Sequence, residues 1–271
     1  MRKNNLFWKY FIAFILLISA LFALFPFVYM VLVSFTQKTV LDMDFDFSSF
    51  SLENYKTIFK SFNMASNLKN SVIVTISTVV LNCIVSSMAA YSFAKMEWKG
   101  RNALFLVYLA TLMIPGQVTM IPVFTIIKKL NLMNTHIAII LPMINAFGVF
   151  LIKQFIEGFP NDLLEVARID GCGENRIFLQ IVVPLIKPVL VSLTIFTFIT
   201  SWNQFLWPLI VASKPSMQTL TLAVATLKSN YLINYGLVMA GSTLTFLPPF
   251  ILYLFLQEQF VQGIALSGIK G

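Results

Sequence analysis

The feature that most constrains this sequence is a series of six long runs without Asp, Glu, Lys or Arg. Each run is long enough to cross roughly 30 Å of hydrocarbon as a helix, which takes about 20 residues. A lone segment in lipid must satisfy its own backbone hydrogen bonds, and these runs lack the alternation of barrel strands, so they predict helices. We therefore expect an all-α, polytopic integral membrane protein with six transmembrane helices. The runs are Tyr10–Gln37, Asn70–Ala94, Asn102–Ile127, Leu130–Ile152, Val189–Ser213 and Ser229–Gln257.

The composition supports the same class of protein. Hydrophobic residues make up 58% of the chain and charged residues 11%, whereas soluble domains are about 45–50% apolar and about 25% charged. The basic start of the chain resembles a signal peptide, but the run that follows is too long for one, so we expect a retained helix. We predict a single transmembrane domain over residues 1–271, with spans at about 10–35, 70–94, 103–127, 137–156, 188–212 and 237–256.

The distribution of basic residues predicts the orientation of the chain. With six spans both termini lie on one side, and a cytoplasmic N-terminus places eleven of the 19 Lys and Arg residues inside and eight outside. This bias follows the positive-inside rule. We expect a multi-pass membrane protein with both termini cytoplasmic, and we explain the net charge of +8 by topology, without nucleic acid as a partner.

The most polar inner segment lies between the fourth and fifth runs. Residues 153–187 hold nine of the thirty charges, and each charge would cost roughly 2.5–3.5 kcal/mol at the bilayer centre. This loop must therefore lie in water or against another protein. Asp162 is placed to cap a short amphipathic helix, Gly171 and Gly173 to end it, and a second helix is expected from Glu174 toward Pro184.

Seven residues of this loop keep a characteristic spacing: Glu165, Val166, Ala167, Gly171, Ile181, Val183 and Pro184. This spacing resembles the EAA loop of permease subunits in ATP-binding-cassette importers. The match departs from that motif at Val166 and Val183, which remain apolar. Three other stretches, at 113–142, 201–211 and 260–271, are similar to the carbohydrate-uptake branch, whose six-helix permeases serve maltose-type importers.

The resemblance implies a type I importer fold and a set of partners. These are a second permease subunit in a heterodimer, two ATP-binding subunits that use ATP and Mg, and an extracellular solute-binding protein. Segment 159–186 would be the cytoplasmic coupling loop, and 260–271 a cytoplasmic tail that reaches the ATPases. The residues implied for coupling are Glu165, Ala167, Arg168, Asp170 and Gly171, and those implied for the tail contact are Gln262, Gly263 and Gly268.

A substrate path is suggested by amide and aromatic side chains inside the apolar runs. Sugars are bound by aromatic faces and by polar groups that find hydrogen-bond partners in a dry site. The tryptophans can equally belong to an interfacial aromatic belt, and the asparagines to interhelical hydrogen bonds. The candidates are Asn82, Asn145, Trp202, Asn203 and Phe205, with Gln204 and Trp207 in the same stretch.

The function that the resemblance implies is import of a sugar, in particular a di- or oligosaccharide, across a bacterial cytoplasmic membrane. The chain has no phosphate-binding G-x-x-x-x-G-K-[ST] motif, no catalytic constellation and no metal-ligand pattern, so we expect no enzyme activity and no cofactor of its own. One alternative is an importer whose cargo is a phosphorylated glycerol or an acidic sugar. An anionic cargo favours a cationic lining, although the spans lack Lys and Arg. Others are an ion-coupled carrier or channel, which usually buries an ionisable group at mid-membrane, and a membrane enzyme.

Overall fold

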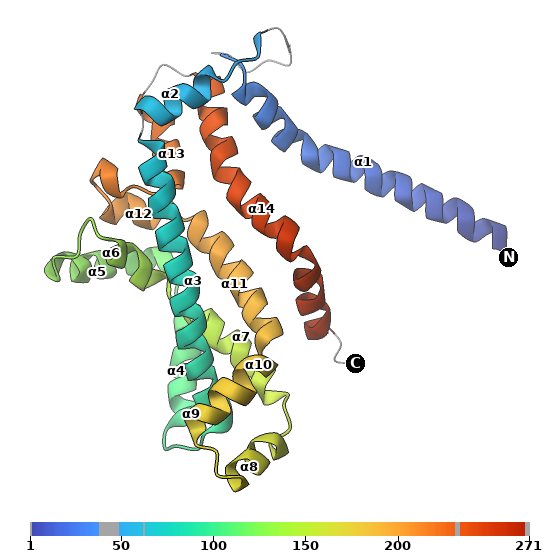
Figure 1. The fold of residues 1–271 in the computed structure, drawn as a ribbon, viewed down its shortest axis with the longest axis vertical. Helices are drawn as coiled ribbons and strands as arrows, with labels where there is room; N and C mark the ends of the chain where they lie inside the picture. Colours follow the sequence, from blue (N-terminus) through green and yellow to red (C-terminus); the bar gives the residue numbers. More distant parts are fainter. Residues whose placement is uncertain (1, 38–48, 62, 231–233, 269–271) are drawn as a thin grey trace. The chain divides into compact units, whose positions relative to one another are not determined.

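The structure is a computed structural model that describes residues 2–37, 49–61, 63–230 and 234–268 (Figure 1). Every regular element in these ranges is helical, which confirms the all-α class. The main helices are α1 (Arg2–Ser34), α2 (Glu53–Ser61), α3 (Met64–Lys95), α4 (Arg101–Leu112), α5 (Gly116–Lys129), α6 (His136–Ile140), α7 (Ala146–Glu157), α8 (Asp162–Ile169), α9 (Glu174–Ile177), α10 (Val183–Leu185), α11 (Lys187–Trp202), α12 (Leu206–Val211), α13 (Leu220–Asn230) and α14 (Tyr235–Gly268).

In the part of the chain that the structure describes, six helical stretches are apolar and long enough to cross a membrane, if each bent pair of helices is one span. Three are single helices in α1, α3 and α14, and three are pairs bent by 103° (α4 with α5), 43° (His136–Met143 with α7) and 74° (Glu174–Leu185 with α11). They follow the order of the six charge-free runs in the sequence. Length and composition therefore support the polytopic membrane fold that the sequence predicts.

The helices of the structure differ from the continuous spans that the sequence predicts, and the differences lie at breaks in the helices. Between α4 and α5 the break falls at Met113–Pro115, where Pro115 is extended at ψ 130° and α5 begins at Gly116. Proline lacks a backbone donor and fits the start of a helix. The fifth span was expected to reach residue 212, but α11 ends at Trp202 and a separate short helix, α12, covers 206–211.

The chain folds as two compact units. The first consists of residues 1–64 and 223–247. In it, the end of α1 is held by Asn54, whose side-chain amide donates to the carbonyls of Ser34 (3.0 Å) and Thr36 (2.7 Å). Gly236 packs directly against this end, since a Cβ there would lie 1.9 Å from the Thr36 carbonyl oxygen. The start of α14 is thereby fitted to the capped end of α1.

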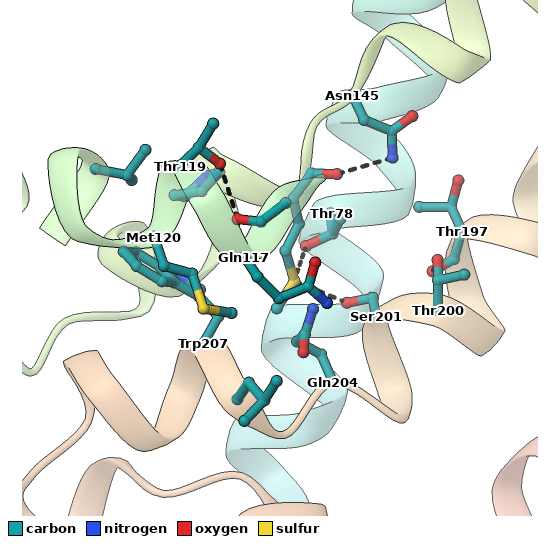
Figure 2. A pocket seen from close by; sticks show the side chains of 15 residues that line it. Thr78, Gln117, Thr119, Met120, Asn145, Thr197, Thr200, Ser201, Gln204 and Trp207 are labelled. Carbon is teal, nitrogen blue, oxygen red and sulfur yellow. Dashed lines mark hydrogen bonds between the residues drawn. The ribbon is translucent and has the colours of Figure 1, made fainter. Parts of the chain in front are cut away.

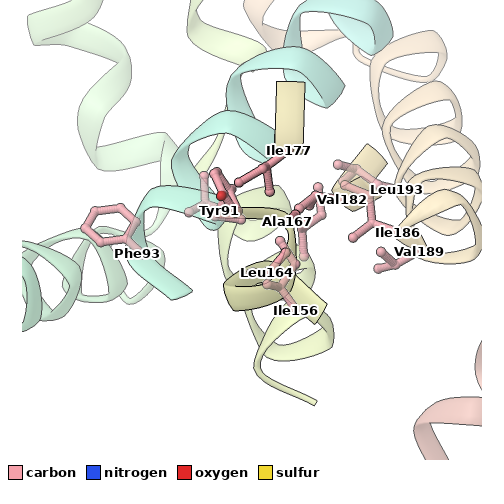
Figure 3. Close-up of a cluster of buried hydrophobic side chains, with 13 residues drawn as sticks. Tyr91, Phe93, Ile156, Leu164, Ala167, Ile177, Val182, Ile186, Val189 and Leu193 are labelled. Carbon is pink, nitrogen blue, oxygen red and sulfur yellow. The ribbon is translucent and has the colours of Figure 1, made fainter. Parts of the chain in front are cut away.

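The second unit, residues 65–222 and 248–271, contains two buried apolar clusters. One cluster joins the beginning of α3, at Val74, to α6 and α12. The other joins the end of α3 to α7, α8, α9 and α11 (Figure 3). In Figure 1 the short helices α8 and α9 lie at the C-terminal end of α3. This second cluster is what positions the polar loop.

Candidate functional site

The amphipathic helix expected in the polar loop is α8, Asp162–Ile169. Asn161 holds the N-cap position, and its backbone carbonyl accepts from Leu164 and Glu165, with no side-chain cap. The sequence placed the cap one residue later, at Asp162. Asp162 instead lies in the first turn, where its negative charge interacts favourably with the helix dipole.

Gly171 ends α8 in a left-handed conformation, with φ +79°. Its amide donates to the Arg168 carbonyl at 3.0 Å, and the amide of Cys172 donates to the Ala167 carbonyl at 2.9 Å. These two bonds form a Schellman motif, which satisfies carbonyls at the end of a helix. The glycine is therefore required by the backbone, since a Cβ there would meet nothing within 4 Å.

One face of α8 is fixed to the body of its own chain. Leu164 is 5% exposed and Ala167 is 7% exposed, and both belong to the apolar cluster that includes Ile156 and Ile177 (Figure 3). The resemblance places Ala167 among the residues that contact the ATPase. In this structure its methyl group lies inside the permease and helps to seat the helix.

The opposite face of α8 carries an exposed apolar ridge, formed by Leu163, Val166 and Ile169. All three are at least half exposed, and Ile169 reaches 83%. Spacings of three residues keep side chains on neighbouring parts of a helix surface. Sequence reasoning missed this ridge because apolar residues occupy both faces of so short a helix, and only burial shows which face is free.

Charged side chains surround the ridge. Arg168 Nε donates to Glu174 Oε1 at 2.8 Å, and the Tyr91 hydroxyl donates to Glu174 Oε2 at 2.5 Å. The bond from Arg168 and then that from Tyr91 hold the pKa of Glu174 below its ordinary value, so this carboxylate is ionised at neutral pH. Glu165 and Asp170 are exposed. Arg168 is therefore engaged within the loop, whereas Glu165 lines an open hollow between α8 and the end of α3, with Lys95.

A cavity of about 320 Å³ lies in the second unit, at the bend between α4 and α5 and beside the C-terminal part of α11 (Figure 2). No charged side chain lines it. Its polar lining consists of side-chain amides and hydroxyls, and its apolar lining includes Trp207 and two methionines. The lining residues are Thr78, Gly116, Gln117, Thr119, Met120, Val123, Pro142, Met143, Asn145, Thr197, Thr200, Ser201, Gln204, Leu206 and Trp207.

The structure brings only part of the predicted substrate path to this cavity. Asn145 lines it and also caps α7, accepting from the amide of Phe147 at 3.1 Å. Trp202 is buried and stacks on Phe198, with ring centroids 5.7 Å apart. Asn203 and Phe205 are not among the lining residues either, and the Asn203 amide donates to the Ile199 carbonyl at 2.9 Å. Sequence reasoning missed Gln117, an amide in a charge-free run.

Asn82 lies behind the cavity wall. It is fully buried, donates to the Thr197 hydroxyl at 3.0 Å and accepts from Ser86 at 3.3 Å. Thr197 itself lines the cavity, so Asn82 orients a lining residue. One turn further, α7 approaches α3 so closely at Gly148 that a Cβ there would lie 2.4 Å from Ser86 Oγ.

The residues implied for the C-terminal contact lie on the last part of α14. That helix includes Gln262, Gly263 and Gly268. The surroundings of these three residues are not described, nor is the end of the tail from residue 269. Their contact with a partner stays a prediction from the sequence.

Within the described residues, six apolar helical stretches with an exposed amphipathic helix between the fourth and fifth define the architecture of a polytopic membrane protein. Residues 83–266 match the family described as binding-protein-dependent transport system inner membrane component. The chain belongs to this family, which confirms that it is a permease subunit and not an ATPase.

Individual relatives cover nearly the whole chain. The sequence is 41% identical over 259 residues to the arabinooligosaccharides transport system permease protein of Halalkalibacterium halodurans, covering 93% of each chain. It is 36% identical over 258 residues to the lactose transport system permease protein of Rhizobium radiobacter, covering 94% of each. The fold matches, at a TM-score of 0.82 and 22% identity, a chain in the crystal structure of a bacterial ABC transporter involved in the import of the acidic polysaccharide alginate, covering 96% of this chain and 98% of that one.

Proposed function

We propose that this chain is the permease subunit of a bacterial ATP-driven importer for a neutral di- or oligosaccharide. It pairs with a second, related permease subunit to form the translocation pathway. Two ATP-binding subunits, which use ATP and Mg, drive the cycle from the cytoplasm, and an extracellular solute-binding protein delivers the sugar. The chain alternates between outward-open and inward-open states of the shared pathway.

The observation that carries this proposal is the two-faced helix α8. Its inner face, at Leu164 and Ala167, is fastened to the core of the permease, while its outer face exposes Leu163, Val166 and Ile169 to water. An exposed apolar ridge rimmed by charges is typical of a protein interaction site. A helix that joins the core on one side and a partner on the other can pass movement between them.

The partner that fits this ridge is the ATP-binding subunit. The loop carries the motif of the permease family, and the chain belongs to the inner membrane components of binding-protein-dependent transport systems. In the orientation that the basic residues favour, α8 and both termini lie in the cytoplasm. The tail with Gln262, Gly263 and Gly268 is then on the same side and reaches the ATPases, as does the face with Glu165, Asp170 and Gly171.

The substrate class is supported by two independent observations. Relatives at 41% and 36% identity are named for arabinooligosaccharides and lactose. The cavity is lined by amides, hydroxyls and one tryptophan, without a charged group. Such groups can exchange hydrogen bonds with sugar hydroxyls, and an indole face can cover the apolar face of a sugar ring. An anionic cargo would meet no cation there.

A reconstitution experiment tests the proposal. The complex is purified through a tag on this chain, its subunits and the ligand of the co-purifying binding protein are identified by mass spectrometry, and uptake of that ligand is measured in proteoliposomes. We expect uptake that requires internal ATP and the binding protein. Uptake that proceeds without ATP and collapses with the ion gradient would instead establish a secondary transporter.

The charge of the cargo is tested by competition. Unlabelled neutral oligosaccharides should compete with the labelled ligand for uptake in this system. Phosphorylated glycerol and an acidic sugar serve as the comparison, and we expect neither to compete. Competition by either anion, with none by the neutral sugars, would contradict a cavity suited to neutral cargo.

A further inference from the structure

Helix α3 runs unbroken from the cavity to the polar loop, and it is longer than α7, which joins the same two places in the described part of the second unit. Thr78 on α3 lines the cavity, and Tyr91 and Lys95 lie near its other end. Tyr91 lies thirteen positions after Thr78, which corresponds to about 20 Å along a helix. α3 is not adjacent to the loop in the sequence, so its connection to α8 depends entirely on side chains.

Two hydrogen-bonded groups on α3 make that connection, one at each end of α8. At the entrance, Lys95 Nζ donates to the Phe159 carbonyl at 2.8 Å and to Asn161 Oδ1 at 2.6 Å. At the exit, the Tyr91 hydroxyl donates to Glu174 at 2.5 Å. Residues four apart lie on the same face of a helix, so a single face of α3 holds both ends of α8.

The exit contact is reinforced by its surroundings. Glu174 is also bonded to Arg168, the second-last residue of α8, at 2.8 Å. The Tyr91 ring is buried and lies 5.6 Å from the Phe178 ring, and it belongs to the apolar cluster that seats Leu164 and Ala167. Hydrogen bonds to ionised groups are stronger than those between neutral groups, so Glu174 fastens α8 firmly to α3.

The covalent route out of the exit of the loop has breaks that α3 lacks. It passes through a π-helical turn, Phe178–Val182, and then a 74° bend into α11. The entrance comes from α7, which runs unbroken from Asn145 at the cavity to Glu157. The 43° bend before α7 lies on the cavity side of that stretch. α3 has no break between Thr78 and Lys95.

We propose that α3 transmits the movement of the coupling helix to the cavity, and that Tyr91 and Lys95 are the positioning residues that fasten the loop to it. This inference rests on the proposed function of α8. Movement of α8 carries the end of α3 with it, and α3 transfers the displacement past the close contact with Gly148 to Asn82 and Thr78. Loss of either fastening leaves the ATPases docked but poorly coupled to the cavity.

The first test removes one hydroxyl group. Tyr91→Phe keeps the ring in its cluster and removes the bond to Glu174. Tyr108→Phe is the matched control, since Tyr108 also packs on this cluster and no hydrogen bond of its hydroxyl is observed among the described residues. In proteoliposomes we expect Tyr91→Phe to lower the sugar imported per ATP hydrolysed by about tenfold, with the ATPase rate in the absence of binding protein retained.

The basic contact is tested in the same way. Lys95→Met keeps the length of the side chain and removes its donors, and Lys99→Met is the control at an exposed lysine on the following connection. We expect Lys95→Met to lower the coupling ratio by several-fold and Lys99→Met to leave it unchanged. Equal behaviour of Tyr91→Phe and Tyr108→Phe, in a wild-type complex that imports sugar with ATP, would overturn the role of α3. Failure of the wild-type complex to import sugar would overturn the proposed function instead.

A distance measurement covers the case in which a variant fails to assemble. Spin labels are attached to the native Cys172 in the loop and to Met88→Cys on the exposed side of α3, with Cys83→Ser to leave one native label. In the otherwise wild-type complex, the distance between the two labels should stay the same in the resting and vanadate-trapped states. A distance that changes between these states would show that the loop moves independently of α3, and would overturn the inference.

Discussion

At the scale of single residues, two glycines have different physical roles. Gly171 is needed for its backbone conformation, with φ +79° and open space where a side chain would lie. Gly148 is needed for close packing, because a Cβ there would lie 2.4 Å from Ser86 Oγ. The sequence motif predicts the importance of Gly171, whereas nothing in the local sequence around Gly148 identifies the helix that it contacts.

The loss of stability when Gly171 is replaced should depend on the backbone strain of the new residue and not on the size of its side chain. Gly171→Val should destabilise the end of α8 by about 1–2 kcal/mol more than Gly171→Asn, since Asn tolerates the left-handed region and β-branched residues do not. Hydrogen exchange of the loop and uptake of sugar measure the effect. Gly173→Val is the control, because Gly173 is extended at φ −71°. Equal losses in Gly171→Val and Gly173→Val would contradict this explanation.

Replacement of Gly148 should separate α7 from α3. Gly148→Ala should lower the free energy of unfolding of the detergent-purified protein by about 1–3 kcal/mol, the usual cost of overpacking, and thereby lower its melting temperature. Ser86→Ala in the same chain should recover part of that loss, because it removes the nearest atom. Gly116→Ala, at a position with open space around it, should melt like the wild type. A Gly148→Ala variant as stable as Gly116→Ala would show that the contact is loose.

At the scale of helices, sequence reasoning located the elements better than their breaks. Charge-free runs predicted six apolar helical stretches, because lipid requires continuous apolar helices. Proline alone did not predict which runs bend. Pro115 lies at a 103° bend, while Pro122 lies within the continuous helix α5. Packing against neighbouring helices decides which proline lies at a bend, and the local sequence does not specify where those helices lie.

The polar loop shows the same limit for the site. Its spacing predicted a short helix ended by Gly171, and the structure has that helix. The sequence does not distinguish the two faces of α8. The motif places Ala167 on the partner side and marks Val166 only as a departure, whereas in the structure Ala167 is buried and Val166 is exposed. Asn82, likewise a candidate for sugar contact, lies behind Thr197.

The outward ridge of α8 gives a prediction at this scale. Val166→Asp should abolish association of the ATP-binding subunits, because it places a charge in the middle of an apolar contact surface. Val166→Ile should retain association. Co-purification of the subunits from membranes measures both. Stable co-purification and normal uptake with Val166→Asp would exclude the ridge from the interface.

At the scale of the whole molecule, the chain consists of two compact units built from discontinuous segments. The coupling helix, the cavity and α3 all belong to the second unit, so the proposed transmission lies within one unit. Both units contain long apolar helices, and composition therefore predicts a single transmembrane domain without indicating this division.

The orientation of the chain is testable by labelling. In a background without native cysteines, a cysteine at exposed Leu179 in the loop should react with a membrane-impermeant maleimide only after the cells are opened. A cysteine at exposed Lys56 on α2 should react in intact cells. The expectation follows from a cytoplasmic N-terminus and six spans. The reverse pattern of labelling would place the coupling loop outside the cell.

The central claim is that α8 contacts the ATP-binding subunit through the ridge formed by Leu163, Val166 and Ile169. A photo-reactive amino acid at position 166, in the assembled complex in its native membrane, tests this contact most directly, with position 88 on the exposed side of α3 as the control. The account predicts a cross-link from position 166 to the ATP-binding subunit and none from position 88. Cross-linking from position 166 only to lipid, or to no other subunit, would contradict it.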